Sequence, residues 1–182
     1  MKKESTALYV LRLALTLFAI TAVVAAALAG VNHITAPIIA AAKEAKTQEA
    51  ISMVLPGGGS EIAFTDDTGL VSKVYASEAG YAVQVCPSGF DGGIDMMVGI
   101  DKNGNVTAIT IINHTETAGL GAVAAAKTSA GEAFRSQFAG MSGVLAVSKD
   151  GGDVEAITGA TITSRAVTAG VNAALSCVAG LG

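Results

Sequence analysis

Residues 94–112 read IDMMVGIDKNGNVTAITII, and they carry the clearest structural signal of the chain. Two runs of aliphatic and β-branched residues, Ile94–Ile100 and Val106–Ile112, flank the polar segment Asp101–Asn105. Such runs favour β-strands, and an Asn-Gly pair between two of them is a strong hairpin signal. The stretch therefore predicts two antiparallel strands joined by a tight turn.

Outward from this hairpin the pattern predicts further short strands and two helices. The expected strands are Val71–Tyr75, Tyr81–Cys86 and Leu145–Ser148, and the expected helices are Ala122–Phe138 and Ser164–Val178. Strands paired in hairpins, with helices between and after them, indicate an α+β domain with a mostly antiparallel sheet. The turn Gly89–Gly93 is rich in glycine and precedes the hairpin.

The N-terminal part of the chain predicts a single transmembrane helix. Leu13–Val31 contains no charged residue, and its 19 residues would extend about 28 Å as a helix, close to the thickness of the hydrocarbon core. Lys2, Lys3 and Arg12 precede it, which places the N-terminus in the cytoplasm and the rest of the chain outside the cytoplasmic (inner) membrane. A signal peptide cleaved after Ala29 is the alternative, and it puts the remaining domain on the same side.

A helical stalk is expected between the anchor and the domain. Ile38–Val54 alternates apolar and charged residues, Pro37 stands near its expected start, and a Pro-Gly-Gly-Gly sequence follows it. The expected parts are a cytoplasmic tip and anchor at 1–31, a stalk at 32–56 and an extracytoplasmic domain at 57–182.

Charge and composition exclude a nucleic-acid partner. From Met1 to Val31 the formal charge is +2, but from Asn32 onward 14 acidic residues face 8 Lys and Arg residues. The clustered Lys and Arg that neutralise phosphates are missing, Trp is absent, and aromatic residues make up 4%.

Two cysteines, Cys86 and Cys177, lie far apart and outside any metal-binding spacing. They are interpreted as small core residues, and a disulfide between them stays open because sequence alone does not place their Cα atoms. No metal ligands and no catalytic residue are assigned.

Residues 155–167 read EAITGATITSRAV and suggest an anion site. Ser164 could cap the final helix, whose unpaired N–H groups and dipole favour a phosphate. Gly159 would let the backbone approach it, and Arg165 could add a charge-assisted bond. A capped helix without a ligand would give the same pattern.

Thr158–Ser164 resembles the S/T-G-A-T-x-T-S flavinylation signature of the FMN-binding domain family. That family includes the G subunits of Rnf electron-transport complexes and the C subunits of sodium-translocating NADH:quinone reductases. The resemblance implies that a flavin transferase esterifies Thr161 to the phosphate of FMN, giving phosphothreonyl-FMN. It also implies cofactor contacts from Thr158, Gly159, Ala160, Thr163 and Ser164. The family usually has an Asp six residues before the threonine; here Glu155 stands there with Asp153 nearby, and which of them serves is open.

A second match lies at His114–Gly121, which resembles the H-x-E-T-P-G-L-G loop of the same family, with Ala118 in place of the proline. In the family this loop lies near the flavin. The resemblance therefore implies cofactor contacts from His114, Glu116, Thr117, Gly119 and Leu120.

Taken together, the resemblance implies a membrane-anchored electron-transfer subunit that carries covalent FMN in an Rnf-type, ion-translocating ferredoxin:NAD oxidoreductase. Its partners would be the other membrane and peripheral subunits, and the flavin edge would stay partly exposed to them. It would be an electron carrier of a translocase, and turnover by this chain alone is not claimed. The alternatives are a quinone-reductase C subunit, an exported non-redox binding module, and a domain that holds FMN without a covalent bond. The coupling ion, the redox potential and the immediate electron donor and acceptor stay open.

Overall fold

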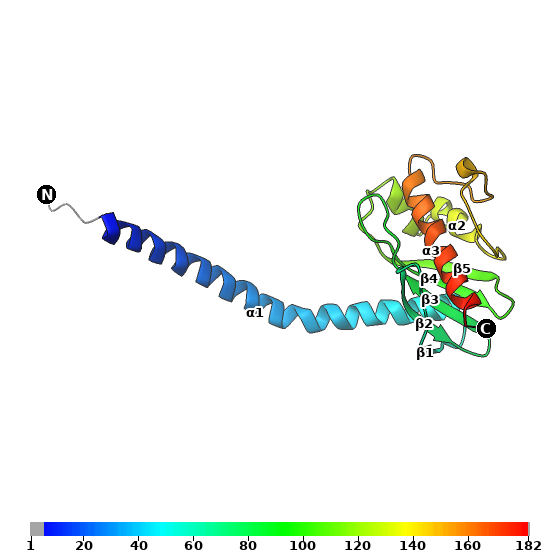
Figure 1. Cartoon of the computed structure of the whole chain (residues 1–182), viewed down its shortest axis with the longest axis horizontal. Coiled ribbons are helices and arrows are strands. Elements are labelled where there is room, and N and C mark those ends of the chain that lie inside the picture. Colours follow the sequence, from blue (N-terminus) through cyan, green and yellow to red (C-terminus); the bar gives the residue numbers. More distant parts are fainter. Residues whose placement is uncertain (1–5, 182) are drawn as a thin grey trace. The chain divides into compact units, whose positions relative to one another are not determined.

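The computed structural model describes residues 6–181 (Figure 1). Lys2 and Lys3, on which the predicted orientation partly rests, lie outside the described residues. The chain divides into two compact units, one up to Ala45 and one from Lys46 onward. The predicted boundaries at residues 31 and 56 stay predictions.

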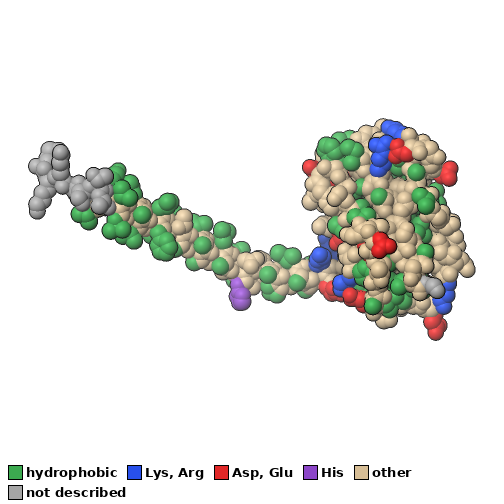
Figure 2. Space-filling view, in the orientation of Figure 1, with side chains coloured by type: hydrophobic (Ala, Val, Ile, Leu, Met, Phe, Trp, Pro, Cys, Tyr) green, Lys and Arg blue, Asp and Glu red, His purple; other side chains and the backbone are tan. Residues whose placement is uncertain are grey.

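Helix α1 spans Thr6–Val54 without interruption (Figure 1). Residues 38–54 are helical as predicted, and the helix ends at Val54, but its expected start near Pro37 is wrong, because Pro37 lies inside α1. Proline removes one N–H from the helical ladder, and here this local loss does not end the helix. Within residues 6–181, α1 is the one helix long and apolar enough to cross a membrane. Large hydrophobic side chains are exposed at many positions of α1 from Leu8 to Ile39, and Figure 2 shows hydrophobic side chains along the helix.

The second unit is built on a five-stranded antiparallel sheet, in the order β1-β2-β3-β4-β5. The strands are β1 (Ser60–Ile62), β2 (Val71–Ala76), β3 (Gly80–Val85), β4 (Asp95–Asp101) and β5 (Val106–Asn113). The predicted hairpin is confirmed as β4 and β5, and the N–H of Asp101 donates to the carbonyl of Asn105 at 2.9 Å. β1 was not predicted, because three residues are too few to show a period.

Both faces of the sheet are buried. Met96, Val98 and Ile100 of β4 enter the larger core together with α3. Met97 faces the other way and packs with Ile51, in the last turns of α1. Alternate residues of one strand thus enter two cores, as the period of two in a strand requires.

Two short helices follow β5. They are the 3₁₀-helix η1 (Gly121–Ala125) and α2 (Ser129–Ser136), so the single predicted helix over Ala122–Phe138 is wrong. The first ends at Ala125, with Ala126 as its C-cap, and Thr128 caps the second, because the Thr128 side chain accepts a hydrogen bond from the N–H of Gly131. Phe134 and Phe138 meet edge to face, with ring centroids 5.6 Å apart, in the larger core.

The segment before the last helix does not form the strand predicted at Leu145–Ser148. Val147 makes only an isolated bridge to Val154, and the 3₁₀-helix η2 (Ser148–Asp150) follows at once. The chain then enters α3 (Thr161–Ala179), which packs against the sheet through Val167. The predicted α+β class, with one long apolar N-terminal helix, is confirmed.

Candidate functional site

The two motifs singled out in the sequence meet at one cavity. Its volume is about 300 Å³, and it lies between the 114–121 loop, the turn before β4, η2 and the start of α3. The residues that line it are Phe90, Glu116, Thr117, Leu120, Gly121, Lys149, Gly159, Ala160, Thr161, Ile162 and Thr163. Segments far apart in the chain therefore form one site.

The start of α3 contributes backbone as well as side chains. Thr161 is the first helical residue, and Ala160 at the N-cap has no side-chain cap. Because a helix leaves the N–H groups of its first turn without internal partners, this end favours an anion. Gly159 has a φ of +77°, which glycine adopts without strain, and a Cβ there would come within 3.2 Å of Leu120.

Ser164 does not cap the helix as predicted. Its hydroxyl accepts the N–H of Ile157 at 2.9 Å and donates to the carbonyl of Ala160 at 3.0 Å. It is fully buried and ties the incoming loop to the first turn. Because α3 begins at Thr161, Ser164 lies in the first turn of the helix, and its role in this structure is to hold the loop in place.

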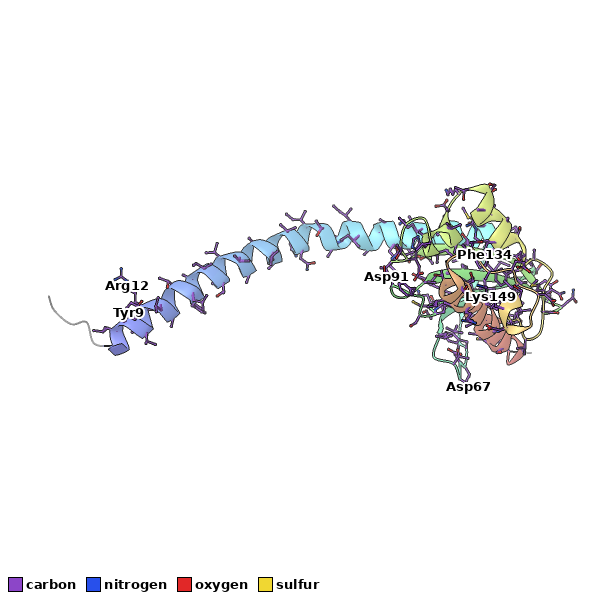
Figure 3. All side chains as sticks on the ribbon, turned by 90° about the horizontal axis from the view of Figure 1, so that it is seen from above. Tyr9, Arg12, Asp67, Asp91, Phe134 and Lys149 are labelled. Atoms are coloured by element: carbon purple, nitrogen blue, oxygen red, sulfur yellow. The ribbon has the colours of Figure 1, made fainter. Side chains whose placement is uncertain are left out.

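Lys149 lies beside the hydroxyl of Thr161. Its Nζ donates to Thr161 Oγ1 at 3.1 Å, and Figure 3 shows it over α3. Arg165, which the sequence suggested as a phosphate ligand, instead forms two bonds of 2.6 Å with the carboxylate of Asp150. This pairing holds the pKa of Asp150 below its ordinary value, through the hydrogen bond and then the charge of Arg165.

Glu116 is buried and joins three segments. Its Oε1 accepts the N–H groups of Phe90 and Asp91 at 2.8 and 3.1 Å, and its Oε2 accepts the hydroxyl of Thr163. Thr117 also donates to the side chain of Asp91 at 3.3 Å. The 114–121 loop is therefore fastened both to the turn before β4 and to the first turn of α3.

The electrostatics of Glu116 follow from these bonds. Burial alone raises the pKa of its carboxyl, since desolvation disfavours the charged form. Four groups outweigh burial and hold the pKa below the ordinary value: the hydroxyl of Thr163, the backbone N–H groups of Asp91 and Phe90, and the neighbouring His114. Glu116 is thus a carboxylate at neutral pH, and its oxygens already serve three internal donors.

The structure brings together most, but not all, of the residues that the sequence singled out. Those lining the cavity are Glu116, Thr117, Leu120, Gly159, Ala160, Thr161 and Thr163. Those outside its lining are His114, Gly119, Thr158 and Ser164. Of the buried side-chain nitrogen and oxygen atoms in the described part of the chain, Nδ1 of His114 is the one without a hydrogen-bond partner.

The acidic residues before the motif lie apart from the cavity lining. Glu155 accepts the hydroxyl of Ser148 at 3.3 Å, and its backbone is held on both sides by the amide of Gln137. Asp153 is exposed. Glu155 thus secures the loop that carries η2.

Sequence reasoning assigned no role to Phe90, Lys149 or Ile162, which also line the cavity. Phe90 is 67% exposed and Ile162 50% exposed, and Leu120 beside them is 46% exposed. Three large apolar side chains at one opening are a signal that only the fold reveals. Lys149 had no sequence signal, since it is one of several lysines in an ordinary loop.

The chain is similar to proteins of known families. The FMN-binding domain family matches residues 89–176. The G subunit of the Na(+)-translocating ferredoxin:NAD(+) oxidoreductase complex of Acetobacterium woodii is 36% identical over 189 residues, which cover 90% of this chain and 88% of that protein. The G subunit of the proton-translocating ferredoxin:NAD(+) oxidoreductase complex of Clostridium ljungdahlii is 34% identical, covering 83% and 82%. The G subunit of the ion-translocating oxidoreductase complex of Escherichia coli K12 is 43% identical over 94 residues, 48% of this chain and 44% of that protein. These similarities, with the FMN-binding domain match, show that the chain belongs to the family of G subunits of the ion-translocating (Rnf-type) oxidoreductase complexes.

Proposed function

We propose that this chain is an electron-transfer subunit of an Rnf-type complex and carries FMN esterified through its phosphate to Thr161. The single observation that carries the proposal is the position of Thr161. Thr161 is the first residue of α3 and lines a cavity to which both flavin-related motifs contribute.

The groups around Thr161 suit a phosphate. The N-terminus of α3 supplies backbone donors, Lys149 supplies an ammonium group next to the hydroxyl, and Gly159 keeps the approach free of a side chain. Leu120, Ile162 and Phe90 supply the apolar contacts that an aromatic ring system would need. The donor set and the apolar rim therefore fit a flavin nucleotide.

Bound FMN would supply one- and two-electron transfer, while the protein sets its position and surroundings. A covalent phosphoester would prevent loss of the cofactor into a compartment where free flavin is dilute, since noncovalent occupancy depends on ligand concentration. A volume of about 300 Å³ is at the lower limit for ligand pockets, which supports a flavin held with one edge exposed to partner subunits.

The rest of the chain supports a relay role. Between Leu8 and Ala42 the only charged side chain of α1 is that of Arg12, so this helix offers no intramembrane acid for ion transfer. Basic residues precede the apolar span and acidic sequence follows it, which favours a cytoplasmic N-terminus and an extracytoplasmic FMN domain. Other subunits of the complex would move the ion, and a flavin transferase would load this one.

In-gel flavin fluorescence tests the covalent bond. The full chain is expressed with an active flavin transferase, denatured and run on a gel beside Thr161→Ala. A fluorescent wild-type band and a dark Thr161→Ala band are expected. Ser176→Ala is the matched control, because it removes an exposed hydroxyl at the far end of the same helix and should stay fluorescent.

A dark wild-type band, with the transferase active on a known substrate, would refute covalent attachment. A fluorescent Thr161→Ala band would move the attachment to another hydroxyl, and peptide mass mapping would find it.

A further inference from the structure

We propose that Lys149 is a positioning residue for the linkage at Thr161: its ammonium group is the counter-charge that holds the flavin phosphate at the start of α3. The inference rests on the proposed function and adds a residue that neither flavin-related motif contains. Of the described residues that line the cavity, Lys149 is the only one with a positive side chain.

The position of Lys149 is built by the fold. Each of the three residues of η2 bonds to a different residue: one in the loop before α3 and two in the first turns of α3. The bonds are Ser148 Oγ to Glu155 Oε2 at 3.3 Å, Lys149 Nζ to Thr161 Oγ1 at 3.1 Å, and Asp150 to Arg165 at 2.6 Å twice. A lysine in a loop fixed on both sides loses less freedom when it binds than one on a free loop.

The other charges near the site make this counter-charge necessary. Glu116 is a carboxylate that lines the same cavity and bonds to Thr163, two residues from Thr161. A phosphate on Thr161 would therefore be introduced near a like charge, which disfavours it. Arg165 is held by Asp150, so Lys149 is the cation of this cluster that faces the hydroxyl.

Attachment of the flavin to Thr161 requires an activated flavin donor. The oxygen of Thr161 forms a bond to the flavin phosphorus of a dinucleotide, in which that phosphorus is part of a phosphoric anhydride. The anhydride bond breaks, the second nucleotide leaves as its monophosphate, and the hydroxyl proton is released. Lys149 takes no proton; it orients the threonine oxygen beforehand and pairs with the phosphodiester afterwards.

The test measures the rate of loading. Purified full-length chain without flavin is incubated in detergent with a flavin transferase and a flavin dinucleotide, and the intact mass is followed with time. Lys149→Met should lower the initial rate by about tenfold, the order expected for one charge-assisted hydrogen bond near the surface. Lys149→Arg should restore it to within about twofold, since the charge is kept. Lys102→Met removes an exposed lysine from the β4–β5 turn and should leave the rate unchanged.

The inference would be overturned if Lys149→Met gained flavin at the wild-type rate. It would also be overturned if the loading rate of Lys149→Arg were as low as that of Lys149→Met. Both results leave the proposed function intact, because the wild-type chain and its Thr161 dependence are measured in the same series. If wild type itself gains no flavin mass, the proposed function fails instead.

Phosphorus NMR of the loaded chains gives an independent readout. The phosphodiester resonance of Lys149→Met should move toward that of the unfolded, flavin-loaded chain, whereas that of Lys102→Met should match wild type. An unchanged resonance in Lys149→Met would show that the ammonium group does not contact the phosphate, and would overturn the inference.

Discussion

At the scale of single residues, Glu116 holds the segments that form the cavity together. Its two oxygens accept three hydrogen bonds from the turn before β4 and from α3. A buried donor that loses its acceptor lowers the stability of the fold, because it has given up its bond to water without gaining another. The Glu116 side chain therefore stabilises the arrangement of the segments that line the cavity.

Removing this carboxylate should weaken the folded state. Glu116→Ala leaves two backbone N–H groups and one hydroxyl without partners, so the free energy of unfolding should fall by about 2–4 kcal/mol. Glu116→Gln keeps one accepting oxygen and should lose less. Urea unfolding of the full chain in detergent measures both, and equal losses would show that the accepted bonds contribute little.

The pH dependence of stability has a defined sign. Because the folded pKa of Glu116 lies below its ordinary value of 4.5, its stabilising contribution is complete above pH 4.5 and is lost as the pH falls through the folded pKa. The difference in unfolding free energy between wild type and Glu116→Gln should therefore shrink below pH 4.5. A difference that stays constant as the solution is acidified from neutral pH through the folded pKa would contradict this assignment.

At the scale of elements, the end of α1 sits close against β4. A Cβ on Gly99 would lie 2.5 Å from the carbonyl oxygen of Val54 and 2.4 Å from the hydroxyl of Thr107. That hydroxyl donates to the same carbonyl at 3.1 Å, so it closes the C-terminal end of the helix. The smaller core depends on this close approach.

Gly99→Ala should therefore separate α1 from the sheet and lower the unfolding free energy by about 1–3 kcal/mol, as overpacking does. Gly180→Ala is the control, because the nearest atom to its Cβ would lie at an ordinary 3.5 Å. Thermal unfolding of the two variants makes the comparison. If Gly99→Ala and Gly180→Ala had the same melting temperature, α1 and the sheet could accommodate the extra methyl group at no cost in stability.

Strands β2 to β5 were predictable from the sequence because each of them carries its own run of β-forming residues, whereas β1 is too short to show one. The break between η1 and α2 was not recognised, because the alanine-rich run before Thr128 has strong helical propensity and the tertiary fold overrides it. Position 131 requires glycine, because any Cβ there would clash with the carbonyl oxygen of Ala126. The contact between Lys149 and Thr161 depends on the path of the whole loop between them, and no local sequence pattern predicts that path.

At the scale of the whole molecule, the two cysteines provide a probe of the proposed orientation. Cys177 is buried and free, as expected for a core residue, but Cys86 is exposed and free, so its interpretation as a core residue is wrong. Burial, and then the nearby Asp66, raise the pKa of the Cys177 thiol, which keeps it unreactive. One thiol of the folded domain is thus open to a reagent.

A membrane-impermeant maleimide should label Cys86 in intact cells if the domain lies outside the cytoplasmic membrane. Cys86→Ser should abolish the label, and Cys177→Ser should leave it unchanged. Labelling of wild type only after the cells are lysed would place the domain in the cytoplasm and reverse the proposed topology.

The three hydrogen bonds of Glu116 also have a consequence for the order of events in maturation. They join residues 25, 26 and 47 positions apart, so the walls of the cavity come together only when the domain is nearly complete. Contacts between such distant positions form late, because loop closure opposes them until other structure is in place. In a partly folded chain Thr161 would be accessible, but the residues that line the cavity would not yet be in place around it. Attachment of the cofactor would then act as a checkpoint, marking only those copies that have finished folding.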